Sequence, residues 1–107
     1  MKTLYKAFVE CIFGDDFGRK YPLHDGINRI GKGYHMDICI ADDIQITRDN
    51  HCSIIFNEEK SKCVIVPSIG SLTYLNNSLL KNSIEIKEDD VFRIGRSEFT
   101  VRFYKEE

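Results

Sequence analysis

Three short segments of the 107-residue sequence are rich in groups that donate hydrogen bonds. They are residues 31–35 (Gly-Lys-Gly-Tyr-His), 47–51 (Thr-Arg-Asp-Asn-His) and 68–72 (Ser-Ile-Gly-Ser-Leu). Lys32 and Arg48 supply positive charge, the hydroxyls and amides supply directed hydrogen bonds, and the glycines let a ligand approach the backbone. These are the groups that bind an oxyanion. The segments therefore predict an oxyanion or phosphate pocket, provided that the fold brings them together.

Short β-strands are the elements that would hold these segments. Apolar residues alternate with polar ones far more often than they recur at helical spacing, and no segment supports a helix of ordinary length. The strand-like runs, separated by turn residues, lie at 4–11, 19–23, 27–30, 37–40, 52–56, 62–66, 72–75, 83–87, 91–94 and 98–104. The sequence therefore predicts an all-β sandwich or barrel, a fold in which binding residues usually lie in loops at one end.

Length and composition indicate one globular domain spanning residues 1–107, because the chain can bury one core but not two. The hydrophobic fraction of 42% with 30% charged residues is typical of a soluble protein. No apolar run approaches the roughly 20 residues that a bilayer crossing needs. Charges at Lys2, Lys6 and Glu10 interrupt the first apolar run, which argues against a signal peptide. We expect a cytoplasmic monomer with no membrane partner.

Several chemistries are disfavoured by the sequence. A net charge of −2, with acids and bases mixed along the chain, argues against a nucleic-acid partner. No nucleophile and base are evident as a pair, so we expect no enzyme, no catalytic residue and no cofactor. The acidic pair Asp42-Asp43 fits a turn without a bound cation. The cysteines lack a CxxC pair, so we expect no metal site and free thiols at Cys11, Cys39, Cys52 and Cys63.

The order and spacing of several motifs resemble a forkhead-associated domain over about residues 20–104. The motifs that carry the resemblance are Asn28–Lys32, Asp37–Ile40, Asp42-Asp43, Ile46–Arg48, His51-Cys52, Leu75-Asn76 and Asp89–Gly95. The resemblance implies an eleven-stranded β-sandwich of forkhead-associated type that binds phosphothreonine peptides through its loop ends. It also implies a protein-interaction module in serine/threonine-kinase signalling or assembly, with a phosphorylated protein as its partner.

The resemblance assigns roles to single residues. Gly31-Lys32 stands where the family has Gly-Arg, and Thr47-Arg48 stands where it has Ser-Arg before a histidine. The residues implied to bind the phosphopeptide are Lys32, Thr47, Arg48, Gly70 and Ser71. The residues implied to order the loops are Gly31, His51 and Asn76. The His51 ring is expected to tie two loops together, and Asn76 is expected to be a turn residue that sets the loop at 68–72.

An alternative function stays open at this point. Lys32 keeps a positive charge but lacks the planar fork with which arginine holds phosphate. Asp49 and Asn50 place one residue more before His51 than the commonest form of the family motif has, and Arg48 could brace its own loop against Asp43 or Asp49. The alternative is a structural or assembly domain that keeps the forkhead-associated fold and has lost phosphate-dependent recognition.

Overall fold

The computed structural model describes residues 6–104. Over this range the chain forms eleven β-strands and no helix, which confirms the all-β prediction. The strands are β1 (Ala7–Phe13), β2 (Lys20–Leu23), β3 (Gly26–Gly31), β4 (Ile38–Cys39), β5 (Cys52–Asn57), β6 (Lys62–Pro67), β7 (Thr73–Leu75), β8 (Ser78–Leu79), β9 (Ile84–Ile86), β10 (Phe92–Ile94) and β11 (Ser97–Phe103).

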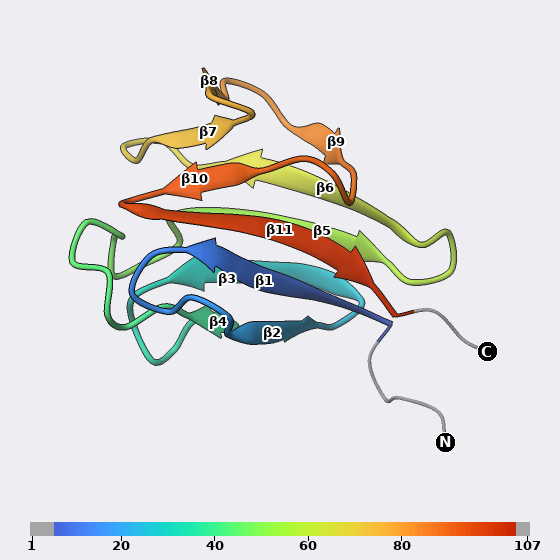
Figure 1. Ribbon diagram of the computed structural model, residues 1–107. Helices are drawn as coiled ribbons and strands as arrows, with labels where there is room; N and C mark the ends of the chain where they lie inside the picture. The colour runs from blue at the N-terminus through green and yellow to red at the C-terminus, as the bar shows by residue number, and fades with distance from the viewer. Residues whose placement is uncertain (1–5, 105–107) are drawn as a thin grey trace.

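The strands form two sheets that pack face to face as a sandwich (Figure 1). The six-stranded sheet has the order β2-β1-β11-β10-β7-β8, and the five-stranded sheet has the order β4-β3-β5-β6-β9. Paired strands are antiparallel in both sheets, except that β3 and β4 run parallel. This arrangement is the eleven-stranded β-sandwich that the resemblance to a forkhead-associated domain implies.

Alternating side chains build the core between the sheets. In β5, Cys52, Ile54 and Phe56 point inward and are at most 2% exposed. From the opposite sheet, Phe92 of β10 and Phe99 of β11 stack with their ring centroids 5.3 Å apart, and neither is exposed. Each fully buried Ile or Phe contributes about 1.5–3 kcal/mol relative to an exposed one. The core therefore provides a rigid support for the loops at both ends.

The strand predictions miss one strand of the structure. The sequence does not predict β8, because the two residues Ser78 and Leu79 are too few to show alternation. Both are exposed, and the strand exists through its pairing with β7. The first predicted strand begins at Leu4, which lies outside the described residues. The predicted turn after β7 is confirmed, since Asn76 and Asn77 have positive φ angles of 49° and 70°.

The cysteine thiols are free, and Cys39 alone among them is not buried. Burial raises the pKa of the Cys52 and Cys63 thiols to about 12, so both stay protonated at neutral pH. Within residues 6–104 there is no helix with the length and hydropathy needed to span a bilayer. The same residues contain no group of three or more His, Cys, Asp or Glu side chains placed to hold a metal ion.

Candidate functional site

The three donor-rich segments lie in loops at the same end of the sandwich, on the left in Figure 1. The β3–β4 loop contains residues 32–37, the β4–β5 loop residues 40–51, and the β6–β7 loop residues 68–72. The first two are joined by backbone bonds, because the N–H groups of Lys32 and Gly33 donate to the carbonyls of Thr47 and Arg48 at 2.8 Å each. The fold therefore brings the segments together, as the phosphate-pocket prediction requires.

Gly31 and Gly33 permit this close approach of two loops. A Cβ on Gly31 would lie 2.8 Å from the Arg48 carbonyl oxygen and 3.0 Å from the Met36 Cγ atom. A Cβ on Gly33 would lie 2.9 Å from the same carbonyl oxygen and would overlap the His35 ring. The sequence predicts that these glycines open the backbone to a ligand; in the structure they make room for the neighbouring loop.

His51 is 3% exposed and its ring lies between two of the loops. Its Nδ1 atom accepts a hydrogen bond from the Thr47 N–H at 3.0 Å, and its Nε2 atom lies 2.9 Å from the Leu72 carbonyl oxygen. Because Thr47 N is a donor and the carbonyl is an acceptor, the proton belongs on Nε2. Ser71 Oγ adds a bond to the His51 carbonyl at 2.8 Å. The β4–β5 and β6–β7 loops are thus connected through His51.

His51→Ala is expected to lower the free energy of unfolding by about 1–3 kcal/mol, because the partly buried Thr47 N–H and Leu72 carbonyl lose the bonds that they make to the buried His51 ring. Urea unfolding monitored by circular dichroism measures this change. His35→Ala is the matched control, since His35 is exposed and its ring bonds to the exposed Asp49 side chain. This variant is expected to cost less than about 0.5 kcal/mol. Equal stability losses in the two variants would contradict the bridging role.

The hydroxyls of Thr47 and Ser71 are both engaged with the backbone. Thr47 Oγ1 donates to the Asp49 carbonyl at 2.6 Å, and Ser71 Oγ donates to the His51 carbonyl at 2.8 Å. A hydroxyl has one proton, so in this conformation neither side chain has a donor left for an anion. Both residues shape their loops, and a bound oxyanion would have to take these protons from the carbonyls.

The two cations of the site differ in how they are held. Lys32 is half-buried, whereas the Arg48 side chain is 74% exposed, and its nearest charged partner is Asp49 Oδ1 at 3.7 Å. Asp49 also bonds to His35 Nε2. Exposed ion pairs contribute at most about 1 kcal/mol. The Arg48 guanidinium therefore remains available to a stronger anionic partner. Asp43, the other acid that could brace Arg48, bonds instead to Arg96 and Ser97 at the β10–β11 turn.

A hollow of about 320 Å³ lies between the β4–β5 loop, the β6–β7 loop and strand β10. Thr47, Gly70 and Ser71 line it, whereas Lys32 and Arg48 do not. Residues that the sequence analysis missed complete its wall: Tyr74, and Arg93, whose guanidinium carbon is 4.2 Å from the Tyr74 ring centroid. That contact is a cation–π interaction, which fixes the Arg93 head group beside the candidate residues.

Asn76 is a turn residue, as the sequence predicts, and its side chain bonds to the segment before β10. It follows β7 at the end away from Ser71, and its Oδ1 atom accepts the Val91 N–H at 2.9 Å while its Nδ2 atom donates to Asp90 at 3.0 Å. These bonds fix the segment that leads into β10. The Asn76 side chain thus orders the start of β10, and its expected role in setting the loop at 68–72 stays a prediction.

Asp43 fastens the β4–β5 loop to the β10–β11 turn. Its carboxylate is 1% exposed and accepts bonds from Ser97 Oγ at 2.7 Å and from the N–H groups of Arg96 and Gln45 at 2.8 and 2.9 Å. Gly95 at the turn has a φ of +57°, and a Cβ there would lie 2.8 Å from the carboxylate oxygens. The turn can therefore close on Asp43 only because position 95 is glycine.

Comparison with known proteins gives one family. Residues 28–95 match the sequence model described as the FHA domain. No curated protein sequence matches. Among solved structures, the FHA domain of FhaA, crystallised with the intracellular domain of Rv3910, is 26% identical and has a TM-score of 0.75 over 90% of this chain and 99% of that one.

Two further solved structures are similar over most of their length. One, from a study of phosphothreonine-dependent FHA domain interactions, is 25% identical, with a TM-score of 0.77 over 94% of this chain and 99% of that one. The other is the N-terminal FHA domain of S. cerevisiae Rad53p in complex with a phosphothreonine peptide. It is 12% identical, with a TM-score of 0.76 over 92% and 94% of the two chains, and supports the fold alone.

Proposed function

Because this chain belongs to the forkhead-associated (FHA) domain family, we propose that it is an interaction module that binds a phosphothreonine-containing protein. The observation that carries the proposal is that the loops containing Arg48, Thr47 and Ser71 lie at one end of the sandwich and are held together by His51. The similarity to FHA domains whose interactions are phosphothreonine-dependent supports it. The protein would act by equilibrium binding, with no chemical step and no cofactor.

The phosphate would be held mainly by positive charge. A phosphothreonine carries close to two negative charges at neutral pH and offers three acceptor oxygens. Arg48 would exchange its exposed contact with Asp49 for two parallel hydrogen bonds to phosphate, and Lys32 would add a point charge from the neighbouring loop. Gly70 and Ser71 would contact the peptide backbone. If the hydroxyl of Thr47 or Ser71 also donates a hydrogen bond to the phosphate, it must first give up its bond to a backbone carbonyl. This loss lowers the net free energy gained on binding.

The partner is proposed to be a protein phosphorylated by a serine/threonine kinase, in a signalling or assembly pathway in the cytoplasm. Free cysteines suit a reducing compartment. Several large apolar side chains in the loops of the candidate site are exposed to solvent. The exposed fraction is 92% for Tyr34, 74% for Ile44 and 58% for Leu72, and Ile69 is fully exposed. Exposed apolar side chains that gather at one end of a protein favour contact with another protein surface. The module itself is proposed to be a monomer.

A second candidate function is an assembly domain without phosphate dependence. The engaged hydroxyls of Thr47 and Ser71 and the contact of Arg48 with Asp49 favour it, because a loop end that satisfies its own donors gains less from an anion. In that case the exposed apolar side chains around the site would supply the affinity, and phosphorylation of the partner would change little.

Calorimetry against a phosphothreonine peptide library separates the two functions. The phosphothreonine form of a selected peptide is expected to bind at least about tenfold more tightly than its unphosphorylated form, a difference of about 1.4 kcal/mol. The phosphoserine form of the same peptide controls for recognition of charge alone. Equal affinity for the phosphorylated and unphosphorylated peptides would select the assembly domain.

A further inference from the structure

The outer face of the five-stranded sheet carries a row of apolar side chains. Ile27 of β3 pairs with Ile55 of β5, which pairs with Val64 of β6. Ile27 is 58% exposed, Ile55 is 39% exposed and Val64 is partly exposed. The solvent face of an antiparallel sheet is normally polar. A row of three apolar residues across three adjacent strands therefore leaves apolar area open to a partner.

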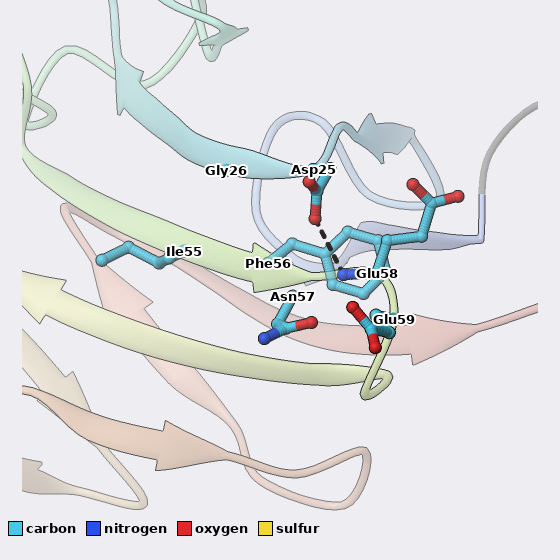
Figure 2. A pocket seen from close by; sticks show the side chains of 7 residues that line it. All are labelled: Asp25, Gly26, Ile55, Phe56, Asn57, Glu58 and Glu59. Atoms are coloured by element: carbon cyan, nitrogen blue, oxygen red, sulfur yellow. Dashed lines mark hydrogen bonds between the residues drawn. The ribbon is translucent and has the colours of Figure 1, made fainter.

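A hollow of about 610 Å³ adjoins this row, where β5 ends and the chain turns into β6. Ile55 lines it on one side, and Asp25, Glu58 and Glu59 line it beyond the end of β5 (Figure 2). The Asp25 carboxylate accepts the Glu58 N–H at 2.9 Å, which joins the β2–β3 and β5–β6 turns and forms the hollow. The apolar row and the acidic hollow are therefore one continuous surface.

The charge of this surface is net negative. Glu85 of β9 is exposed and pairs with Val64, so it adds a carboxylate at the other end of the row. The four carboxylates outnumber the three exposed lysines of the same region, Lys60, Lys62 and Lys87. Arg29 of β3 is also positively charged, but its Nε atom lies 3.2 Å from Asp37 Oδ2, so the charge of Asp37 offsets it.

We propose that this surface binds a polypeptide segment that combines apolar side chains with Lys or Arg. The apolar groups would cover Ile27, Ile55 and Val64, and the cations would enter the hollow beside Glu58 and Glu59. Phosphate backbones and anionic membranes would be repelled by the carboxylates. A second copy of this chain docked face to face would set carboxylate against carboxylate, which opposes association.

The surface is separate from the phosphopeptide site. The β2–β3 and β5–β6 turns lie on the right in Figure 1, and the candidate phosphate loops lie on the left, at the opposite ends of the strands. A partner could therefore use this surface without being phosphorylated and while the loop end is occupied. Such a two-site arrangement raises overall affinity when both segments belong to one partner.

The direct test is a titration of ¹⁵N-labelled protein with a short synthetic peptide that alternates Lys and Leu. Saturable shifts are expected for amides at residues 25–27, 55–59 and 64, and none for residues 47–51 and 68–72. Matched peptides that alternate Glu with Leu, or Lys with Ser, are expected to bind at least about tenfold more weakly, because each lacks one of the two required features. Shifts confined to the loop end, or equal binding of the three peptides, would overturn the proposal.

Variants of the surface provide the second readout. Ile55→Ser and the double change Glu58→Lys with Glu59→Lys are each expected to weaken binding of the Lys–Leu peptide about tenfold. Ile44→Ser, which removes a more exposed isoleucine at the other end of the molecule, and Arg48→Ala are expected to leave it unchanged. The charge variant changes only exposed side chains and so stays informative if Ile55→Ser fails to fold. Unchanged affinity in the charge variant, or dimerisation that Ile55→Ser abolishes, would refute the assignment.

Discussion

Arg48→Ala is expected to weaken binding of a phosphothreonine peptide by at least about tenfold, and to weaken it more than Lys32→Ala does. The planar guanidinium of Arg48 has the geometry to hold two phosphate oxygens at once, whereas the Lys32 ammonium is a point charge. The Arg48 side chain is exposed and only loosely paired with Asp49, so its removal should leave the fold intact. The difference between the two variants therefore reports on the ligand and not on folding.

Lys32→Arg is the matched gain-of-function change. It restores the residue that the family has at this position and is expected to tighten binding of the same peptide severalfold. Calorimetry of the parent and the three variants gives the dissociation constants, after circular dichroism has shown that each is folded. If Arg48→Ala and Lys32→Ala both keep the parent affinity, the phosphate pocket is absent and the assembly function applies.

The strands and the positions of the site loops follow from local patterns in the sequence. Alternation predicts β5 and β6, and the turn residues between the runs predict which segments become loops. β8 is different, because two exposed residues form a strand only through the partner that β7 supplies. Alternation therefore predicts the scaffold and misses a two-residue strand that exists through its pairing across the Asn76-Asn77 turn.

Individual site roles are less predictable, because they depend on contacts between distant segments. Arg93 looks like an ordinary polar residue of a strand, and only the pairing of β10 with β7 places it over Tyr74 and beside the candidate loops. The proton of Ser71 goes to a carbonyl 20 residues away in the sequence. Asn76 satisfies its turn as expected, yet its side chain bonds to Asp90 and Val91. Residue type predicts which interactions a side chain can make, and the tertiary fold decides with which group it makes them.

Asp43 shows the same distinction on a larger scale. The pair Asp42-Asp43 is typical of a turn, and both residues do lie between β4 and β5. Asp42 is exposed, whereas Asp43 is buried and holds the β10–β11 turn, more than 50 residues later in the sequence, through Ser97 and Arg96. Its role in the loop end is structural, and its removal should be among the costliest single changes outside the apolar core.

Asp43→Asn is expected to lower the free energy of unfolding at pH 7 by about 2–3 kcal/mol, because hydrogen bonds to a charged acceptor are worth about 1.5–3 kcal/mol each. The amide would keep one oxygen acceptor and would turn its N–H₂ group toward groups that themselves donate. Asp42→Asn, the exposed neighbour, is the control and is expected to change stability by less than about 0.5 kcal/mol. Guanidinium unfolding of the parent and both variants measures the three values.

The pH dependence of this contribution gives an independent check. Burial opposes ionisation of Asp43, but the bonds from Ser97, Gln45 and Arg96 outweigh it and lower the pKa of the carboxyl below its ordinary value. A carboxyl with a lowered pKa in the folded state stabilises the protein above its unfolded pKa, which is about 3.9, and the stabilisation is lost as the pH falls further. The gap between parent and Asp43→Asn should therefore be full at pH 7 and should shrink below about pH 4. A gap of constant size down to pH 3 would mean that charge on Asp43 does not hold the two loops together.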